Sequence, residues 1–219
     1  MIIWFASGNI HKKKELRDIL SMEMLSSSDN LTEWELKIPS EAGLKFAPEE
    51  KGNSFVENAL IKAEALHRLI EGAAYVIADD SGLCVDALGG RPGIHSARYG
   101  GSTGAQGEFS GAKLGAAEKN ALLLSELGDN PQRKARFICA MVLYCGADRF
   151  FIAQESLEGE LVKTAKGEGG FGYDPILFIP HLGRTVAELS EEEKNLISHR
   201  GKAARAIAKI LNGIITPPK

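Results

Sequence analysis

The chain has 219 residues with 44% hydrophobic and 25% charged content, which fits one large globular domain and excludes a disordered or fibrous protein. The net charge of −3 argues against a general nucleic-acid binder, because such proteins usually carry a basic domain. The three cysteines lack metal-ligand spacing and no apolar run approaches 18 residues, so we expect reduced thiols, no membrane span and a cytoplasmic location.

The first predicted elements are a buried strand over residues 2–6, a tight turn at 7–9 and a helix. Lys12 stands four residues before Leu16, which belongs to the inward apolar stripe of this helix. We therefore expect Lys12 to lie over the end of the strand. The backbone N–H groups of the turn and the helix N-terminus favour a phosphate cradle, although a solvated lysine run at 12–14 explains these residues equally well.

A capping box marks the start of the next helix, with Ser54 as the N-cap and Glu57 reaching back to it. The core stripe of this helix runs to about residue 71. Asn58 and Lys62, spaced i,i+4, share a different face, where an ordinary solvated lysine is an equally good interpretation of Lys62. The segments before this helix are predicted to be a loop at 24–33, a weak strand at 34–38 and an irregular stretch at 39–53.

A short apolar run at residues 74–78 predicts a second buried strand, and two adjacent carboxylates, Asp79 and Asp80, follow it. Ser81 and Gly82 are then expected to turn the chain. Because ligands gather outside the carboxyl ends of strands in α/β sheets, these acids are candidates for a metal ligand or a general base. A turn in which Asp and Ser merely close the strand is the competing interpretation.

The remaining chain is predicted to add an antiparallel pair of strands to βα units, and to form one domain over residues 1–219. Glycine-rich segments mark two loops, at 100–115 and at 168–175, of which the first is the candidate for a mobile loop. The predicted elements are a hairpin or excursion at 83–99, a helix at 112–127, strands at 135–145 and 150–156, and a strand at 176–179. A helix follows that begins with a capping box at Ser190 and Glu193 and ends at Ile197. After the link His199-Arg200, a final helix is expected to end at Asn212-Gly213.

Three predicted loops thus carry polar chemistry at strand ends: residues 7–12, 79–81 and 171–174. A fourth segment, His199-Arg200, lies between two predicted helices. These segments offer carboxylates for a divalent cation, lysines for phosphates, an aromatic face and a His-Arg pair that can bind the polar edge of a ring. This inventory fits an enzyme that acts on a nucleotide polyphosphate better than a peptide or sugar site.

Seven motifs follow one another between residues 7 and 200: Ser7-Gly8-Asn9-Ile10-His11-Lys12, Ser54-Phe55-Val56-Glu57-Asn58-Ala59, Lys62-Ala63, Ala78-Asp79-Asp80-Ser81-Gly82-Leu83, Gly93-Ile94-His95-Ser96-Ala97-Arg98-Tyr99, Gly170-Phe171-Gly172-Tyr173-Asp174-Pro175 and Ser198-His199-Arg200. Each motif is weak by itself, but seven in order are very specific. Together they resemble the inosine triphosphate pyrophosphatase family, the enzymes that remove non-canonical purine nucleoside triphosphates.

The resemblance implies an α/β fold with a long, twisted, mixed β-sheet flanked by helices, in two lobes around a central cleft, and usually a homodimer. It implies hydrolysis of ITP, dITP and XTP to the monophosphate and pyrophosphate, with Mg2+ as the cofactor. By match, Asp80 is the proton acceptor and a metal ligand, and Glu49 is the second metal ligand, with Glu50 as the alternative. The substrate-binding residues implied are Ser7, Gly8, Asn9, Ile10, His11, Lys12, Lys62, Ser81, Phe171, Gly172, Tyr173, Asp174, Lys194, His199 and Arg200.

Selectivity for the base follows from hydrogen bonding. Inosine and xanthine present a 6-oxo acceptor that a donor from His199 or Arg200 can satisfy. Adenine would instead leave that donor facing an amino group, an unpaired buried group that costs about 1–3 kcal/mol.

Two other classes of protein compete with this interpretation. A haloacid-dehalogenase-type phosphatase would need a DxD pattern after a strand, which Asp79-Asp80-Ser81 lacks. A non-catalytic nucleotide-binding module would need no metal-binding acids. The products from ITP distinguish these classes: a pyrophosphatase releases pyrophosphate, a phosphatase releases orthophosphate, and a binding module releases neither.

Overall fold

The computed structural model describes residues 1–25, 34–72, 75–103, 109–110, 114–146 and 149–215. The chain divides into two compact units. Unit 1 comprises Met1–Asp80, Cys139–Glu155 and Asn195–Lys219, and unit 2 comprises Ser81–Ile138 and Ser156–Lys194.

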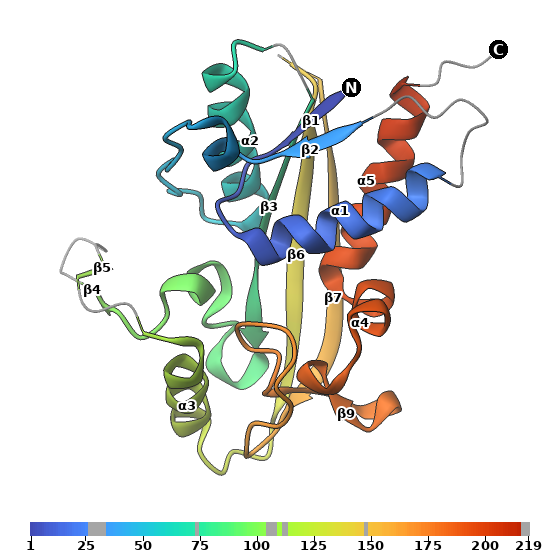
Figure 1. The fold of residues 1–219 in the computed structure, drawn as a ribbon. Coiled ribbons are helices and arrows are strands. Elements are labelled where there is room, and N and C mark those ends of the chain that lie inside the picture. Colours follow the sequence, from blue (N-terminus) through green and yellow to red (C-terminus); the bar gives the residue numbers. More distant parts are fainter. Residues whose placement is uncertain (26–33, 73–74, 104–108, 111–113, 147–148, 216–219) are drawn as a thin grey trace. The chain divides into compact units, whose positions relative to one another are not determined.

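The strands are β1 (Ile2–Phe5), β2 (Glu35–Lys37), β3 (Tyr75–Val85), β4 (Ser102–Thr103), β5 (Phe109–Ser110), β6 (Lys134–Tyr144), β7 (Phe150–Leu161), β8 (Leu177–Ile179) and β9 (Arg184–Thr185). In the described residues, seven of them form one sheet in the order β2-β1-β3-β6-β7-β8-β9 (Figure 1). β1 pairs in parallel with β2 and β3, whereas β8 pairs antiparallel with β7 and β9. The sheet is therefore mixed, which confirms the predicted fold class.

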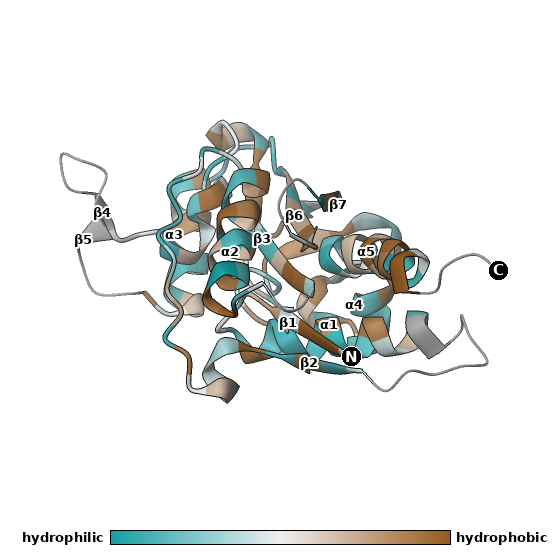
Figure 2. Cartoon of the chain, turned by 90° about the horizontal axis from the view of Figure 1, so that it is seen from above, coloured by the Kyte–Doolittle hydropathy of each residue, from teal (hydrophilic) through white to brown (hydrophobic). Residues whose placement is uncertain are grey.

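The helices are α1 (Ile10–Leu25), α2 (Phe55–Leu69), α3 (Ala116–Leu127), α4 (Glu191–Ile197) and α5 (His199–Ile215). Figure 2 shows hydrophobic and hydrophilic residues mixed along α2 and α5, as expected of helices that bury one face. No helix in the described part of the chain is long and apolar enough to cross a membrane.

Both predicted capping boxes lie at helix starts, but only the second has the expected form. Ser190 and Glu193 exchange hydrogen bonds of 3.2 Å and 2.9 Å between side chain and backbone. At α2, Ser54 Oγ accepts from the Glu57 N–H at 3.1 Å, but the Glu57 carboxylate accepts from the Asn53 N–H rather than from that of Ser54. The chain before α2 therefore bends back over the first helical turn, which positions the nearby acidic residues 49–50.

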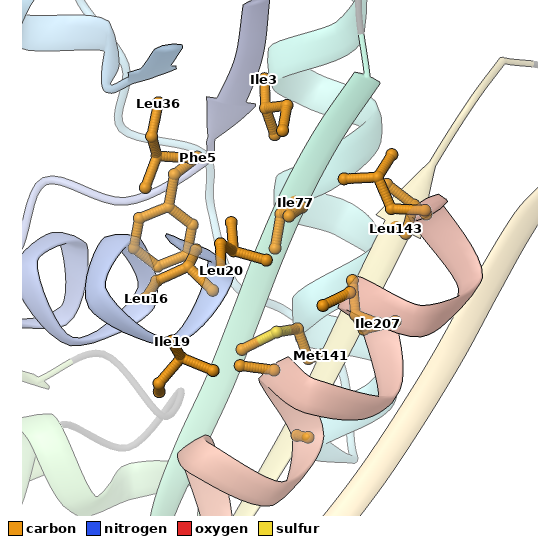
Figure 3. Close-up of a cluster of buried hydrophobic side chains, with 14 of the residues drawn as sticks. Ile3, Phe5, Leu16, Ile19, Leu20, Leu36, Ile77, Met141, Leu143 and Ile207 are labelled. Carbon is orange, nitrogen blue, oxygen red and sulfur yellow. The ribbon is translucent and has the colours of Figure 1, made fainter. Parts of the chain in front are cut away.

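The core of unit 1 has two layers, one on each face of the sheet. α1 and α5 cover one face, where their inward residues meet β1, β3 and β6 (Figure 3). α2 covers the other face with Ala59, Ala63 and Leu66, against Val76 and Ala78 of β3. The residues of the first layer that Figure 3 labels are Ile3, Phe5, Leu16, Ile19, Leu20, Leu36, Ile77, Met141, Leu143 and Ile207.

The prediction that a strand ends at Asp79 and that Ser81-Gly82 turn the chain is wrong. β3 continues through these residues to Val85, and nearly all of it is buried. The preference of Asp, Ser and Gly for turns is only a weak tendency, and the pairing of β3 with its neighbours in the sheet overrides it. Both carboxylates therefore lie inside a strand rather than on a loop.

Several other predicted boundaries also move. α3 begins at Ala116 instead of 112, and residues 112–113 lie outside the described part of the chain. α5 begins at His199, so the expected link between two helices is its first turn, and it continues past Gly213 to Ile215. Of the expected mobile loop at 100–115, β4 and β5 are described as an antiparallel pair, whereas 104–108 and 111–113 lie outside the described residues.

Candidate active site

The side chains of Asp79 and Asp80 lie on opposite faces of the sheet, one in each layer of unit 1, because successive side chains of a strand point to opposite faces. Asp79 follows Ile77 on the face that α1 and α5 cover, and Asp80 follows Ala78 on the face that α2 covers. β1 ends at Phe5, and its pairing with β3 ends beside Ile77. The two acids thus lie just past the carboxyl end of β1, where a parallel sheet places its ligands.

Asp79 is the anion of a buried ionic cluster. Its Oδ2 lies 2.9 Å from Lys12 Nζ and 3.2 Å from Arg200 Nε, and its side chain is fully buried. Burial alone would raise the pKa of Asp79, but the charges of Lys12 and Arg200 outweigh it and hold that pKa well below its ordinary value. The prediction that Lys12 lies over the end of the first strand is confirmed, and the solvated alternative is wrong.

Arg200 joins this cluster to α1. Its Nη1 lies 2.6 Å from Glu15 Oε2, and the residue is only 3% exposed. Sequence reasoning missed Glu15, although its position three residues after Lys12 places it on the same side of the helix. Since the guanidinium is bonded to two carboxylates, the assignment of Arg200 to a purine edge stays a prediction, as does that of the buried His199 beside it.

Asp80 forms a second cluster with residues of α2. Its Oδ1 lies 2.9 Å from Lys62 Nζ, and its Oδ2 accepts from Asn58 Nδ2 at 3.3 Å. Lys62 is 8% exposed, so the solvated interpretation of this lysine is wrong as well. Burial raises the pKa of Asp80 above its ordinary value, although the charge of Lys62 opposes the rise and that of Glu50 adds to it.

Of the two neighbouring glutamates, Glu50 belongs to this cluster and Glu49 does not. Glu50 Oε2 lies 3.7 Å from Lys62 Nζ, and its side chain is 28% exposed. The Glu49 side chain is 78% exposed and pairs with Lys51 at 2.8 Å. The structure thus brings Glu50, the alternative to Glu49, into the cluster and leaves Glu49 outside it, while the assignment of either residue as the second metal ligand stays a prediction. Asn58 was not counted among the predicted site residues, but it belongs to this cluster, because its i,i+4 spacing places it on the same face of α2 as Lys62.

The turn before α1 is organised by Asn9. The Asn9 Oδ1 accepts from the N–H groups of His11 at 2.9 Å and Lys12 at 3.2 Å, so Asn9 caps the helix. The Asn9 N–H in turn donates to Ser7 Oγ at 3.1 Å. Two N–H groups of the predicted phosphate cradle are thus already bonded to Asn9 in this structure.

The glycine-rich loop of unit 2 forms its own cluster around Asp174. Asp174 Oδ2 accepts from the Phe171 N–H at 2.7 Å and from Lys194 Nζ at 2.8 Å. The Lys194 ammonium also lies over the Phe171 ring, 4.5 Å from its centroid, a cation–π contact. Tyr173 is buried, and its hydroxyl donates to the Ser96 carbonyl at 2.9 Å. In this structure the side chains of Tyr173 and Asp174 therefore hold the loop together.

The structure thus gathers the predicted residues into two groups, one in each unit. Ser81, also predicted to bind substrate, is partly exposed and follows Asp80 in β3. The predicted residues that lie in unit 1 are Ser7, Gly8, Asn9, Ile10, His11, Lys12, Glu49, Lys62, Asp80, His199 and Arg200. The ionic clusters of this unit add Glu15, Asn58 and Asp79, and they include Glu50, the alternative to Glu49. The residues of unit 2 are Phe171, Gly172, Tyr173, Asp174 and Lys194.

Comparison with known proteins gives a consistent result. A model of the Ham1 family matches residues 3–210. A dITP/XTP pyrophosphatase of Treponema denticola is 45% identical over 213 residues, covering 97% of this chain and 100% of the relative. One of Clostridium perfringens is 38% identical over 218 residues, 96% of this chain and 97% of the relative. The solved structure of a Ham1 protein from Coxiella burnetii has a TM-score of 0.79 and 34% identity, covering 97% and 98% of the two chains.

Proposed function

The chain belongs to the Ham1 family, and we propose that it hydrolyses the non-canonical purine nucleoside triphosphates dITP, ITP and XTP to the monophosphate and pyrophosphate, which removes them from the nucleotide pool. The observation that carries the chemistry is the cluster of Asp80, Glu50 and Lys62. It sets two carboxylates against one ammonium group, in a partly buried site. Such a site suits a divalent cation and a polyphosphate, and the activity named for the relatives supplies the purine class.

The reaction is an attack of water on the α-phosphorus. The new bond joins the water oxygen to this phosphorus, the bridging bond to the β-phosphate breaks, and pyrophosphate leaves with the bridging oxygen. Asp80 accepts the proton of the water. A general base works best when its pKa approaches the working pH, and burial moves the pKa of Asp80 in that direction.

Two lysines supply positive charge to the leaving pyrophosphate. Lys62 lies beside the proposed base on one face of the sheet, and Lys12 lies on the other face, each held by a carboxylate of β3 at 2.9 Å. Because Asp79 and Asp80 hold the two lysine ammonium groups in place before substrate arrives, the lysines need little reorganisation as charge builds up on the phosphate oxygens. Asn58 orients the Asp80 carboxylate through its amide.

Mg2+ fits the donor set of this cluster. Among the described residues, no group of three or more His, Cys, Asp or Glu side chains forms a metal cage. Mg2+ needs no such cage, since it commonly binds one or two carboxylates and completes its shell with substrate phosphates and water. Asp80 and Glu50 would hold it, and when bound it would acidify the attacking water and neutralise phosphate charge.

The Phe171 ring, partly exposed in unit 2, provides the face on which we place the purine. Lys194, whose ammonium contacts the Phe171 ring, would help to form the pocket for the base. His199 and Arg200 would supply the donors for the 6-oxo group. We also propose a homodimer located in the cytoplasm, in keeping with the nucleotide-pool role, and light scattering after gel filtration tests the dimer.

The test is incubation of the purified chain with ITP, dITP or XTP and Mg2+, with separate enzyme-coupled detection of pyrophosphate and orthophosphate. We expect pyrophosphate in amounts equal to the monophosphate, and its loss in Asp80→Asn. Orthophosphate as the sole inorganic product would identify a phosphatase instead. No turnover of any of the three nucleotides would reject the enzymatic proposal and favour a nucleotide-binding module.

A further inference from the structure

The loop at residues 170–175 of unit 2, here called the Phe171 loop, is bonded to distant parts of the sequence at Asp174, through Ala187 and Lys194, and also by two hydrogen bonds at the residues that follow Phe171. One comes from Tyr173, whose hydroxyl donates to the carbonyl of Ser96 at 2.9 Å. The other comes from α3, where Asn120 Nδ2 donates to the carbonyl of Gly172 at 3.1 Å. Tyr173 and Asn120 are 6% and 5% exposed, so both anchors are shielded from competing water.

The Ser96 anchor is itself fixed. Ser96 Oγ accepts from the Leu83 N–H of β3 at 2.9 Å and donates to the Gly93 carbonyl at 2.6 Å. A series of hydrogen bonds therefore connects β3 through Ser96 to Tyr173. This gives a role to the motif at residues 93–99, which the catalytic scheme does not use.

The Asn120 anchor lies where the loop borders an open pocket. This pocket, of about 660 Å³, is lined by residues of α3 and of the segment that precedes and includes the loop, among them Asn120, Phe171 and Gly172. On the side of this pocket, the loop lacks packed neighbours that would restrain it. The direct bond from Asn120 to the Gly172 carbonyl spans α3 and the loop at this point.

Inside the loop, Phe171 is the partly exposed aromatic side chain, whereas Tyr173 and Asp174 are buried. Asp174 is 4% exposed and is bonded to the Phe171 N–H and to Lys194, and the Tyr173 hydroxyl is bonded to Ser96. Phe171 is partly exposed. The position of its ring therefore depends on the backbone of the residues next to it, which the two anchors hold together with Asp174, and on the contact with Lys194.

We propose that Tyr173 and Asn120 are positioning residues for purine binding, which act by holding the Phe171 ring where the base stacks rather than by touching the substrate. This inference rests on the proposed function. It revises the assignment of Tyr173 as a substrate contact and adds Asn120, which the sequence motifs did not include. Loosening either anchor weakens binding of the base and leaves binding of the polyphosphate unchanged, because the lysines proposed to bind it belong to unit 1.

The test compares Tyr173→Phe and Asn120→Ala with the wild type in steady-state ITP hydrolysis. Inorganic tripolyphosphate serves as a competitive inhibitor that has phosphates but no base. Each variant should raise the KM for ITP about five-fold, the factor that corresponds to one neutral hydrogen bond of ~1 kcal/mol. The inhibition constant of tripolyphosphate should stay within about two-fold of the wild-type value.

Tyr99→Phe is the matched control. Tyr99 is also buried, at 8% exposed, and its hydroxyl donates to the Glu126 carboxylate at 2.6 Å in the same unit, without a bond to the Phe171 loop. The control should lower the melting temperature like Tyr173→Phe while the KM for ITP stays unchanged.

Each outcome decides between the alternatives. A wild-type enzyme that releases no pyrophosphate from ITP overturns the proposed function. If the wild type is active but both variants keep its KM, or if KM and the tripolyphosphate constant rise together, the positioning role is wrong. An equal rise of KM in Tyr99→Phe would show a general effect of stability and would also reject it. Because Tyr173→Phe and Asn120→Ala act on separate bonds, one folded variant is enough to decide.

Discussion

Replacing Asp79 by asparagine should destabilise the protein strongly, because this carboxylate is the counter-ion of two cations. It lies 2.9 Å from Lys12 Nζ and 3.2 Å from Arg200 Nε, and the side chains of Asp79 and Arg200 are 0% and 3% exposed. Asparagine keeps the shape of the side chain but removes its charge. Removing one partner of a buried ion pair typically costs about 3–5 kcal/mol, since the other charge stays buried. For a chain of this size that cost corresponds to a fall in melting temperature of roughly 6–20 °C.

The neighbouring substitution, Asp80→Asn, is the internal control. Burial already disfavours the ionised form of Asp80, so its neutral replacement should change the free energy of unfolding by less than about 1 kcal/mol. Loss of the proposed base should instead lower the rate of pyrophosphate release about 10²–10⁴-fold. Urea unfolding followed by circular dichroism measures stability, and a coupled pyrophosphate assay measures the rate. A stable Asp79→Asn variant, or a fully active Asp80→Asn variant, would refute the division of roles.

The same reasoning predicts how acid acts on the wild type. The pKa of Asp79 is lowered in the folded protein, whereas in the unfolded chain it is about 3.9. The stability that Asp79 contributes is therefore present in full above pH 4 and is lost as the pH falls below 4 through the folded-state pKa. The difference in unfolding free energy between wild type and Asp79→Asn should shrink below pH 4. A constant difference from pH 7 to pH 3 would contradict this.

Three further substitutions test other parts of the site. Glu50→Gln should raise the Mg2+ concentration needed for half-maximal activity at least about ten-fold, whereas Glu49→Gln should leave it unchanged. Equal shifts of the two variants in a metal titration would reject the choice of Glu50. Gly170→Ala should raise the KM for ITP and lower the free energy of unfolding, because Gly170 has φ +71° and an added Cβ would collide with the Asp174 carboxylate. Unchanged kinetics would show that the loop tolerates a displacement of its backbone. His199→Ala should reduce the preference for ITP over ATP about 5–150-fold and change Mg2+ dependence less, and an unaltered ratio of kcat/KM values would exclude His199 from base recognition.

Local patterns were sufficient for much of the fold. Leu16 was assigned to the inward apolar stripe of the first helix, and it is buried in unit 1 together with Ile19 and Leu20 of α1. Ser54 was identified as the N-cap of α2. These features depend on residues within one or two turns of each other, so the sequence contains the information directly. Boundaries were less certain, as at α5, where the predicted link at His199-Arg200 is helical.

The candidate site was predicted residue by residue but not as an arrangement. Both Glu49 and Glu50 precede α2, and only the bend of the chain places Glu50 near Lys62 and leaves Glu49 with Lys51. Asn58 was visible through its i,i+4 spacing, yet its role depends on the position of Asp80 in another element. The sequence offered no signal for the bond between Asn120 and Gly172, because the two residues are 52 positions apart.

The sequence by itself determined which side chains are available: a pair of carboxylates, several lysines, an aromatic residue in a glycine-rich loop and a His-Arg pair. The tertiary structure decided that the carboxylates divide between two faces. Because β3 continues past Asp79 and Asp80, the alternation of a strand directs the first towards Lys12 and Arg200 and the second towards Lys62. Whether a short polar segment continues as a strand depends on its pairing with neighbouring strands, and those contacts are formed only in the folded chain.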